Sequence, residues 1–123
     1  MTEFDNTIAW FEIPVRDLAA GKKFYSTVLK TIFHEVSEGP NPMAIFNFTE
    51  ETVQIKGHLY PGTPASDGTG PTLYFNIPDT VEAAMERVRE AGGGVLSEVI
   101  EIEQGRFAYC QDPDGNSMAL FTR

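Results

Sequence analysis

The chain has 123 residues, a hydrophobic fraction of 41%, a charged fraction of 22% and a formal net charge of −9. This length predicts one domain of ordinary size, and the composition is typical of a folded globular protein. The acidic balance argues against a nucleic-acid partner, because phosphate binding needs clustered lysine and arginine side chains. It is compatible with a cationic ligand, although acidity that only maintains solubility is the commoner explanation.

Neither a membrane segment nor an internal disulfide is expected. No apolar run approaches the roughly 20 residues that a membrane-spanning helix needs. Residues 1–5 are acidic and lack the basic and apolar regions of a secretory signal. Cys110 is the only cysteine, which fits a reducing compartment, and we expect it to be a small buried hydrophobic residue. The sequence therefore predicts a cytoplasmic protein.

The first half of the chain predicts the element order β-α-β-β-β. A strand rich in β-branched and aromatic residues covers 8–15, and Asp17 is placed to cap the following helix. Apolar residues then recur at helical spacing from Leu18 to Leu29. Three further strands are predicted at 31–36, 43–48 and 53–60.

The second half repeats this order after a proline- and glycine-rich stretch at 61–71. A strand at 72–77 precedes a helix in which Asp79 and Glu82 have capping-box spacing and Gly92 to Gly94 mark the end. The buried stripe of this helix is predicted to comprise Val81, Ala84, Met85 and Val88. A strand at 95–102 and a hairpin follow, the hairpin strands being 106–111 and 117–122 around the turn 112–116.

The two halves also resemble each other in sequence. Trp10 to Pro14 aligns with Tyr74 to Pro78 at a shift of 64 positions, and the alignment continues without a gap into both helices. The repeat predicts a single domain over 1–123, built from one module at about 6–60 and another at about 72–123. A linker at about 61–71 joins them, and we expect a binding cleft where the modules meet.

Four motifs occur in an order that is typical of a known family. They are Trp10 to Leu18, Phe24-Tyr25, Ala91 to Gly93, and Asp112 to Asn116 followed by an apolar strand. With them the chain resembles the vicinal oxygen chelate superfamily, the glyoxalase, bleomycin resistance and extradiol dioxygenase group, and within it the short single-domain glyoxalase-like proteins. The resemblance implies an α+β fold in which two βαβββ modules form curved, mostly antiparallel four-stranded sheets around a cleft, with helices outside. It also implies a homodimer.

The resemblance implies a metal site with one ligand on each of four strands. In this sequence the matching positions hold Trp10, Lys56, Thr72 (or Leu73) and Ala119. None of these side chains is an imidazole or a carboxylate, which are the ligands that such a divalent ion needs. We therefore expect no metal and no cofactor.

Two residues further along, the same strand faces offer Glu12 and His58. Glu12 is the candidate catalytic acid or base, because an ionisable group in an apolar strand is costly without a partner. A structural acceptor or a residue at a solvated mouth is the alternative, and a weakly bound ion at Glu12 and His58 stays open. For His58 and for His34 a solvent-facing position is the more expected one.

Strand alternation predicts one concave, partly apolar pocket in which Glu12 is partly desolvated. Its predicted lining is Trp10, Glu12, Lys56, His58, Thr72, Tyr74 and Ala119.

Three functions remain open at this point. The loss of all four ligand positions favours a protein that binds a small molecule without a metal. A lyase or other glyoxalase-related enzyme that uses Glu12 as acid or base, with or without a weakly bound divalent metal, is the alternative. The third is an accessory dimer with a vestigial cleft. The sequence names neither the ligand nor a reaction.

Overall fold

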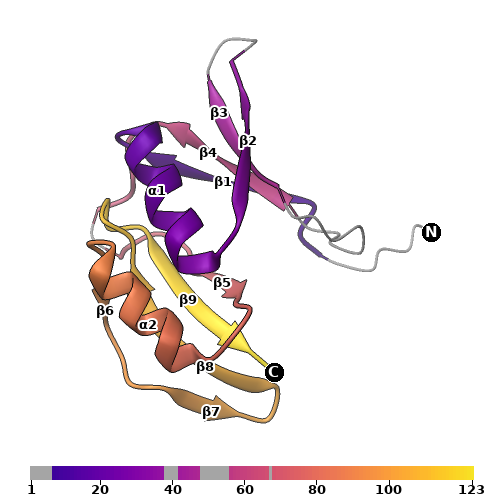
Figure 1. The fold of residues 1–123 in the computed structure, drawn as a ribbon, viewed down its shortest axis with the longest axis vertical. Helices are drawn as coiled ribbons and strands as arrows, with labels where there is room; N and C mark the ends of the chain where they lie inside the picture. Colours follow the sequence, from indigo (N-terminus) through magenta and orange to yellow (C-terminus); the bar gives the residue numbers. More distant parts are fainter. Residues whose placement is uncertain (1–6, 38–41, 48–55, 67) are drawn as a thin grey trace, which may run out of the picture.

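A computed structural model describes residues 7–37, 42–47, 56–66 and 68–123 (Figure 1). The predicted α+β fold with a repeated element order is confirmed. The elements are β1 (Trp10–Val15), α1 (Leu18–Leu29), β2 (Ile32–Val36), β3 (Met43–Asn47), β4 (Lys56–Pro61), β5 (Leu73–Asn76), α2 (Val81–Glu90), β6 (Gly94–Val95), β7 (Ile100–Ile102), β8 (Gly105–Gln111) and β9 (Ser117–Thr122).

The strands form two sheets with the same internal arrangement. The sheet of the first module has the order β1-β4-β3-β2, and that of the second has the order β5-β9-β8-β6, with β7 also paired to β8. In each sheet the first strand of the module runs parallel to the last, and the other pairs are antiparallel. The sequence repeat therefore corresponds to a repeated topology.

The second sheet has five strands where four were expected. The predicted strand 95–102 is divided into β6 and β7, and the break is made by a side chain. Ser97 Oγ accepts the backbone N–H of Tyr109 at 2.9 Å, where an unbroken ladder would use a carbonyl. A hydroxyl that competes with the backbone in this way interrupts a strand.

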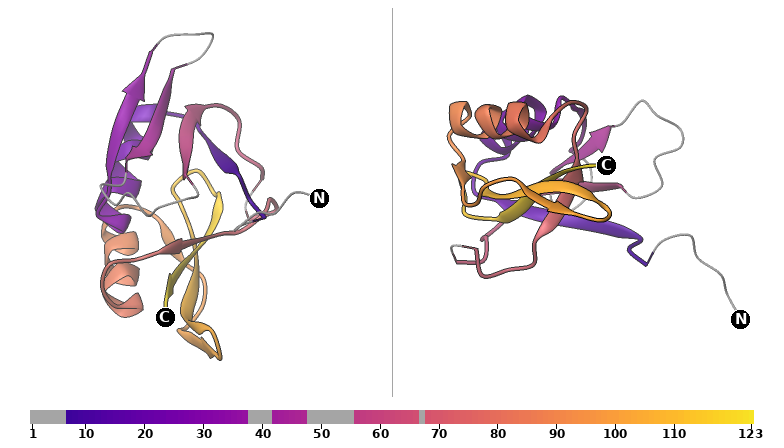
Figure 2. Two further views of the ribbon diagram at one scale, coloured as in Figure 1. Left: turned by 90° about the vertical axis from the view of Figure 1, so that its right-hand side faces the viewer. Right: turned by 90° about the horizontal axis from the view of Figure 1, so that it is seen from below.

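Both helices lie along one side of the two sheets and contact each other (Figure 2). The predicted stripe of α2 is buried, and α1 buries Gly21, Phe24, Tyr25, Val28 and Leu29. An aromatic cluster continues this core, and within it the rings of Phe11 and Phe75 lie 5.9 Å apart. Because these two residues belong to β1 and β5, the modules share one core, in which each fully buried large side chain contributes roughly 1.5–3 kcal/mol.

The two helix caps differ in how well they were predicted. Asp17 caps α1 as expected, with Oδ1 accepting the N–H of Ala20 at 3.0 Å. The cap of α2 is Thr80, whose Oγ1 accepts the N–H of Ala83, so the prediction of Asp79 was wrong. Asp79 instead accepts two hydrogen bonds from the Arg87 guanidinium, at 2.7 and 2.9 Å, which lower the pKa of its carboxyl. This bidentate ion pair is a stronger interaction than a single cap hydrogen bond would be.

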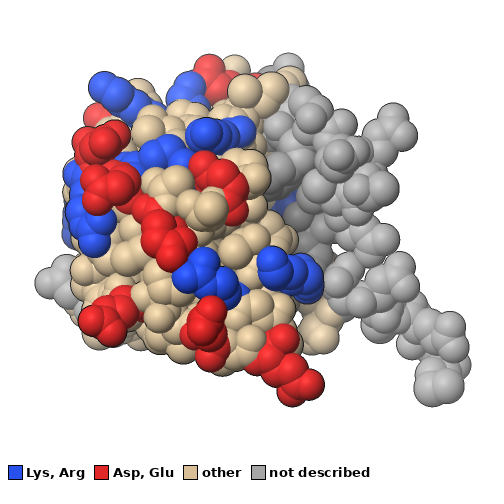
Figure 3. All heavy atoms as spheres, turned by 60° about the horizontal axis from the view of Figure 1, so that its bottom comes forward, with Lys and Arg blue, Asp and Glu red and all other residues tan. Residues whose placement is uncertain are grey.

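Charges of both signs are mixed on the surface. Figure 3 shows lysine and arginine side chains interspersed with acidic ones over one face. Ion pairs in the second module include Arg106 with Glu82 at 2.8 Å and Arg89 with Glu86 at 2.6 Å. Within the described residues of that face, no large basic area is offered to a phosphate backbone. Neither α1 nor α2, nor any other helix in the described ranges, has the length and apolar character needed to cross a membrane.

Candidate functional site

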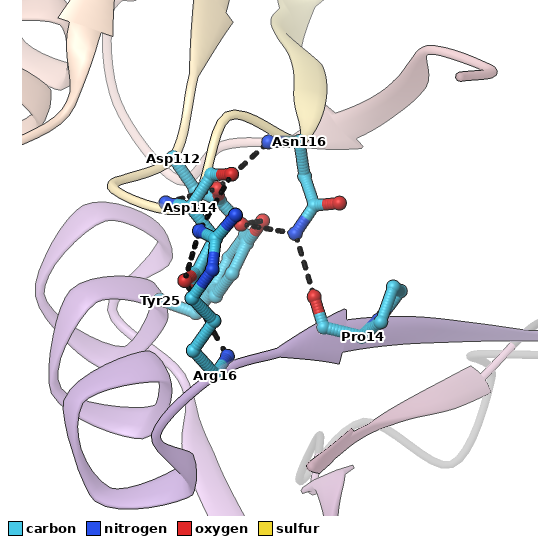
Figure 4. A network of polar contacts seen from close by, with 6 residues as sticks. All are labelled: Pro14, Arg16, Tyr25, Asp112, Asp114 and Asn116. Atoms are coloured by element: carbon cyan, nitrogen blue, oxygen red, sulfur yellow. Dashed lines mark hydrogen bonds and ion pairs between the residues drawn. The ribbon is translucent and has the colours of Figure 1, made fainter. Parts of the chain in front are cut away.

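The turn between β8 and β9, predicted from its proline and glycine, also ties the two modules together (Figure 4). Asp112 is 3% exposed, and its carboxylate accepts four hydrogen bonds. The donors are the Tyr25 hydroxyl at 2.7 Å, the Asn116 side-chain amide at 2.8 Å, and the backbone N–H groups of Asp114 and Asn116, each at 2.9 Å. The Asn116 amide also donates to the Pro14 carbonyl at 2.8 Å. The turn is thereby bonded to α1 and β1.

We call Pro14, Arg16, Tyr25, Asp112, Asp114 and Asn116 the junction network. On its outer side, Arg16 Nη1 forms an ion pair with Asp114 Oδ1 at 3.1 Å. Burial, together with the nearby charge of Asp112, raises the pKa of Tyr25 well above its ordinary value, so that the hydroxyl remains a donor. A cavity of about 90 Å³ lies beside the network, but its charged wall groups already have partners: Arg16, Asp112 and Asp114 bond within the network, and Asp17 caps α1. We therefore assign the junction network a structural role.

One residue of this network has a signal in the sequence. Tyr25 lies on the buried stripe of the predicted helix, and a buried hydroxyl needs a hydrogen-bond partner. The partner lies 87 positions away in the sequence, so its identity required the fold.

The site predicted on β1 and β4 has a definite geometry. These strands pair in parallel, with Trp10 opposite Lys56 and Glu12 opposite His58. Alternation places all four on the face opposite to the buried Ile13. Trp10 Nε1 donates to His58 Nδ1 at 2.9 Å, and His58 Nε2 lies 3.3 Å from Glu12 Oε1. We call these three residues the Trp10–His58–Glu12 row.

Two expectations about the row were wrong. The His58 side chain is only 12% exposed, because it lies between its two polar partners and beside the Tyr60 ring, 6.0 Å away. It is therefore not a surface histidine, unlike His34, which is exposed as expected. The Glu12 side chain is 64% exposed, so the predicted desolvation is absent in the single chain.

Gly57 allows β1 and β4 to approach each other closely where they carry the row. A Cβ at this position would lie 2.4 Å from the Phe11 carbonyl oxygen and 2.4 Å from the Phe11 ring. Any side chain would push β4 away from β1 here. The glycine between Lys56 and His58 therefore helps to set the distance from His58 to Trp10.

The second module presents a pair of tyrosines on its corresponding face. Tyr74 and Tyr109 both pair with Ala119 in the sheet register, and the Tyr74 hydroxyl donates to the Tyr109 hydroxyl at 3.0 Å. This hydrogen bond raises the pKa of Tyr74. Ala119 between them is fully buried, and Thr72 is part-buried with its Oγ1 2.6 Å from Ser117 Oγ. Sequence reasoning did not include Tyr109 in the pocket, because only the strand register shows that it lies beside Tyr74.

The seven predicted pocket residues thus form two groups. Trp10, Glu12, Lys56 and His58 lie on the first sheet, Tyr74 and Ala119 lie on the second, and Thr72 directly precedes β5 of that sheet. The neighbouring residues Phe11 and Phe75 pack into the shared core, so both groups lie on the sheet faces turned away from it. A single pocket that contains all seven stays a prediction.

The donor set does not fit the divalent metal that the resemblance implies. Trp10, Lys56, Thr72 and Ala119 offer no imidazole or carboxylate, and both ring nitrogens of His58 already face protein groups. In the described part of the chain, no three His, Cys, Asp or Glu side chains lie together as a metal site requires.

Comparison with known proteins gives consistent matches over nearly the whole chain. The family model of the Glyoxalase/Bleomycin resistance protein/Dioxygenase superfamily matches residues 7–120. A glyoxylase-like domain-containing protein of Didymella fabae is 28% identical over 124 residues, which cover 94% of this chain and 93% of that protein.

Solved structures share the fold. A glyoxalase/bleomycin resistance protein from Albidiferax ferrireducens T118 has a TM-score of 0.72 at 22% identity, with 96% of this chain and 99% of that chain covered. The fosfomycin resistance protein FosX from Listeria monocytogenes has a TM-score of 0.69 at 17% identity, covering 98% and 93%. Identities this low establish a common fold, and the named activities are those of the neighbours.

Proposed function

The chain belongs to the glyoxalase/bleomycin resistance protein/dioxygenase superfamily, and we propose that it binds a small molecule at the Trp10–His58–Glu12 row without a metal ion. The observation that carries this proposal is the row itself, an ordered set of polar contacts on an open sheet face. In the junction network the carboxylate of Asp112 is bonded within the protein, whereas the Glu12 side chain is 64% exposed. An ordered but unsaturated polar group beside aromatic surface is typical of a ligand site.

The chemistry of the row favours a ligand that donates hydrogen bonds. Glu12 is an acceptor, and Trp10 beside it is 47% exposed and offers an aromatic face. Tyr74, 50% exposed, adds aromatic surface on the second sheet. A protonated amine on an aromatic or other planar body would meet the Glu12 carboxylate and stack on the indole. The net charge of −9 attracts such a cation.

Three probes of nearly equal size test this proposal. Benzylamine, benzyl alcohol and benzoate share one ring and differ in charge, and Trp10 is the only tryptophan, so its fluorescence reports binding directly. With each probe at millimolar concentration, we expect benzylamine to bind more tightly than benzyl alcohol, and benzoate to bind most weakly. Glu12→Gln should remove the preference for the amine. Equal responses to all three probes, or a preference that survives Glu12→Gln, would contradict the proposal.

A catalytic function is the second candidate, and one contact favours it. His58 Nε2 lies 3.3 Å from Glu12 Oε1, so the imidazole orients the carboxylate that a lyase or other glyoxalase-related enzyme would use as acid or base. Each compound that a thermal-shift screen identifies as a ligand should then be incubated with the chain and analysed by mass spectrometry. Product formed by the native chain, and lost in Glu12→Gln, would establish catalysis; unchanged compounds would leave binding as the function.

We further propose a cytoplasmic homodimer in which a second copy helps to cover the open faces. The exposed aromatic residues Trp10, Tyr74 and Tyr109 support this proposal, since large apolar groups in the open often lie at interfaces. The buried, free Cys110 is compatible with a reducing compartment. Light scattering at micromolar concentration should give the dimer mass, and a monomer mass would refute the dimer. Neither nucleic acid nor a membrane is a proposed partner.

A further inference from the structure

We infer that Trp10 is a positioning residue, whose indole N–H holds His58 as the neutral tautomer with its hydrogen on Nε2. This inference rests on the proposed function for its relevance to binding, but the tautomer itself can be measured without any ligand.

The chemistry of the two rings decides which nitrogen donates and which accepts. The indole nitrogen has a hydrogen and no available lone pair, so Trp10 Nε1 can only donate. It lies 2.9 Å from His58 Nδ1, which must therefore be the accepting nitrogen. A neutral imidazole has one accepting and one donating nitrogen. The hydrogen of neutral His58 thus lies on Nε2, the atom that faces Glu12 Oε1 at 3.3 Å.

The surroundings hold the imidazole in this orientation. His58 is in a strand between β1 and β3, where it pairs with Glu12 on one side and Ile45 on the other. The Trp10 and Tyr60 rings lie 5.8 and 6.0 Å from it. Burial cannot account for the position of the indole, because Trp10 is almost half exposed. Its hydrogen bond to His58 is the contact that gives it a defined place.

This arrangement determines what the row offers to a ligand. With Nε2–H toward Glu12, His58 supports the carboxylate as a donor and leaves its outer oxygen as the acceptor for a ligand. Without the indole N–H, the His58 hydrogen can move to Nδ1. An Nε2 lone pair would then face Glu12 and repel it. We therefore expect Trp10 to influence the preference for amines through His58, beyond the contact made by its ring.

Nitrogen-15 NMR of the full chain tests the tautomer directly. The spectrum is recorded at a pH about two units above the ordinary histidine pKa of about 6.5. We expect His58 to show an unprotonated Nδ1 and a protonated Nε2. The exposed His34 should show the averaged shifts of interconverting tautomers in the same spectrum. In Trp10→Phe, which keeps an aromatic ring but removes the donor, the His58 shifts should move toward the averaged values.

Two outcomes would overturn the inference. One is a native His58 that carries its hydrogen on Nδ1, and the other is a folded Trp10→Phe chain in which the His58 shifts are unchanged. The native spectrum decides the first point even if Trp10→Phe fails to fold. Calorimetry then adds the binding consequence: the preference for benzylamine over benzyl alcohol should fall several-fold in Trp10→Phe. If the probes bind normally but His58 has the other tautomer, only the inference is refuted. If His58 has the expected tautomer but no probe binds, only the proposed function is refuted.

Discussion

Asp112 and Glu12 are both carboxylates with polar neighbours, and they differ in how much of their bonding capacity the protein uses. Asp112 is 3% exposed and accepts four hydrogen bonds, two of them from side chains of Tyr25 and Asn116. Glu12 has a side chain that is 64% exposed, and His58 is its polar partner in the row. A buried carboxylate must be fully satisfied by protein donors, because water cannot reach it. The comparison indicates that Asp112 maintains the fold and that Glu12 is available to a ligand.

The largest expected effect comes from removing the saturated carboxylate. Asp112→Ala leaves the Tyr25 hydroxyl, the Asn116 amide and two backbone N–H groups without their acceptor. Each unsatisfied buried donor costs about 1–3 kcal/mol, so we expect the free energy of unfolding in urea to fall by about 3 kcal/mol or more. Glu12→Ala is the matched control and should change it by less than about 0.5 kcal/mol. Similar losses in the two variants would remove the distinction between the carboxylates.

Cys110 sharpens the comparison, because it is a buried ionisable group on which desolvation outweighs the opposing charge of Arg89. It is fully buried, and desolvation raises the pKa of its thiol from 9.0 to about 11. Below pH 9 the thiol is protonated in the folded and the unfolded chain, so the stabilisation linked to its raised pKa is fully present. Between pH 9 and 11 only the unfolded chain ionises, and the free energy of unfolding should fall by about 2–3 kcal/mol.

The measurement is urea unfolding from pH 8 to 11 for the native chain and for Cys110→Ala. The variant should show a distinctly smaller fall over this range. A fall of the same size in both would mean that Cys110 is not the group responsible.

Gly57→Ala tests how the first sheet sets the row. The new Cβ would lie 2.4 Å from the Phe11 carbonyl oxygen, and such overpacking costs about 1–3 kcal/mol. It should also displace His58 from Trp10 and change the tryptophan fluorescence of the folded chain. Gly94→Ala is the control, since no atom lies within 4 Å of its added Cβ. Equal stability of the two variants would contradict the close approach of β1 and β4.

Much of the fold could be predicted because strand and helix periodicity are local properties. Alternation alone put Glu12 with Trp10 and His58 with Lys56 on common faces, and the Asp17 cap followed from its position before an apolar stripe. The remaining features depend on partners that are distant in the sequence. The Trp10–His58 bond spans 48 positions and requires the parallel register of β1 and β4.

The errors come from side-chain contacts that strand and helix periodicity do not report. Asp79 was predicted as a cap because its neighbour in space, Arg87, could not be identified as a competing partner. The strand 95–102 was predicted as continuous because the bond from Tyr109 in β8 to Ser97, which lies between β6 and β7, spans 12 positions of the sequence. His58 was expected at the surface because Gly57 and a nearby loop suggest exposure, whereas its burial depends on Trp10 and Tyr60.

The most direct test measures unfolding and benzylamine binding on the same two variants, Glu12→Gln and Tyr25→Phe. Tyr25→Phe removes one donor from Asp112 and should lower the free energy of unfolding by about 1–2 kcal/mol while the folded chain binds benzylamine as before. Glu12→Gln should leave unfolding within about 0.5 kcal/mol of the native value. It should weaken benzylamine binding about tenfold, because a charge-assisted hydrogen bond is worth roughly 1.5–3 kcal/mol. Unchanged binding in Glu12→Gln would contradict the assignment of Glu12 to the ligand site.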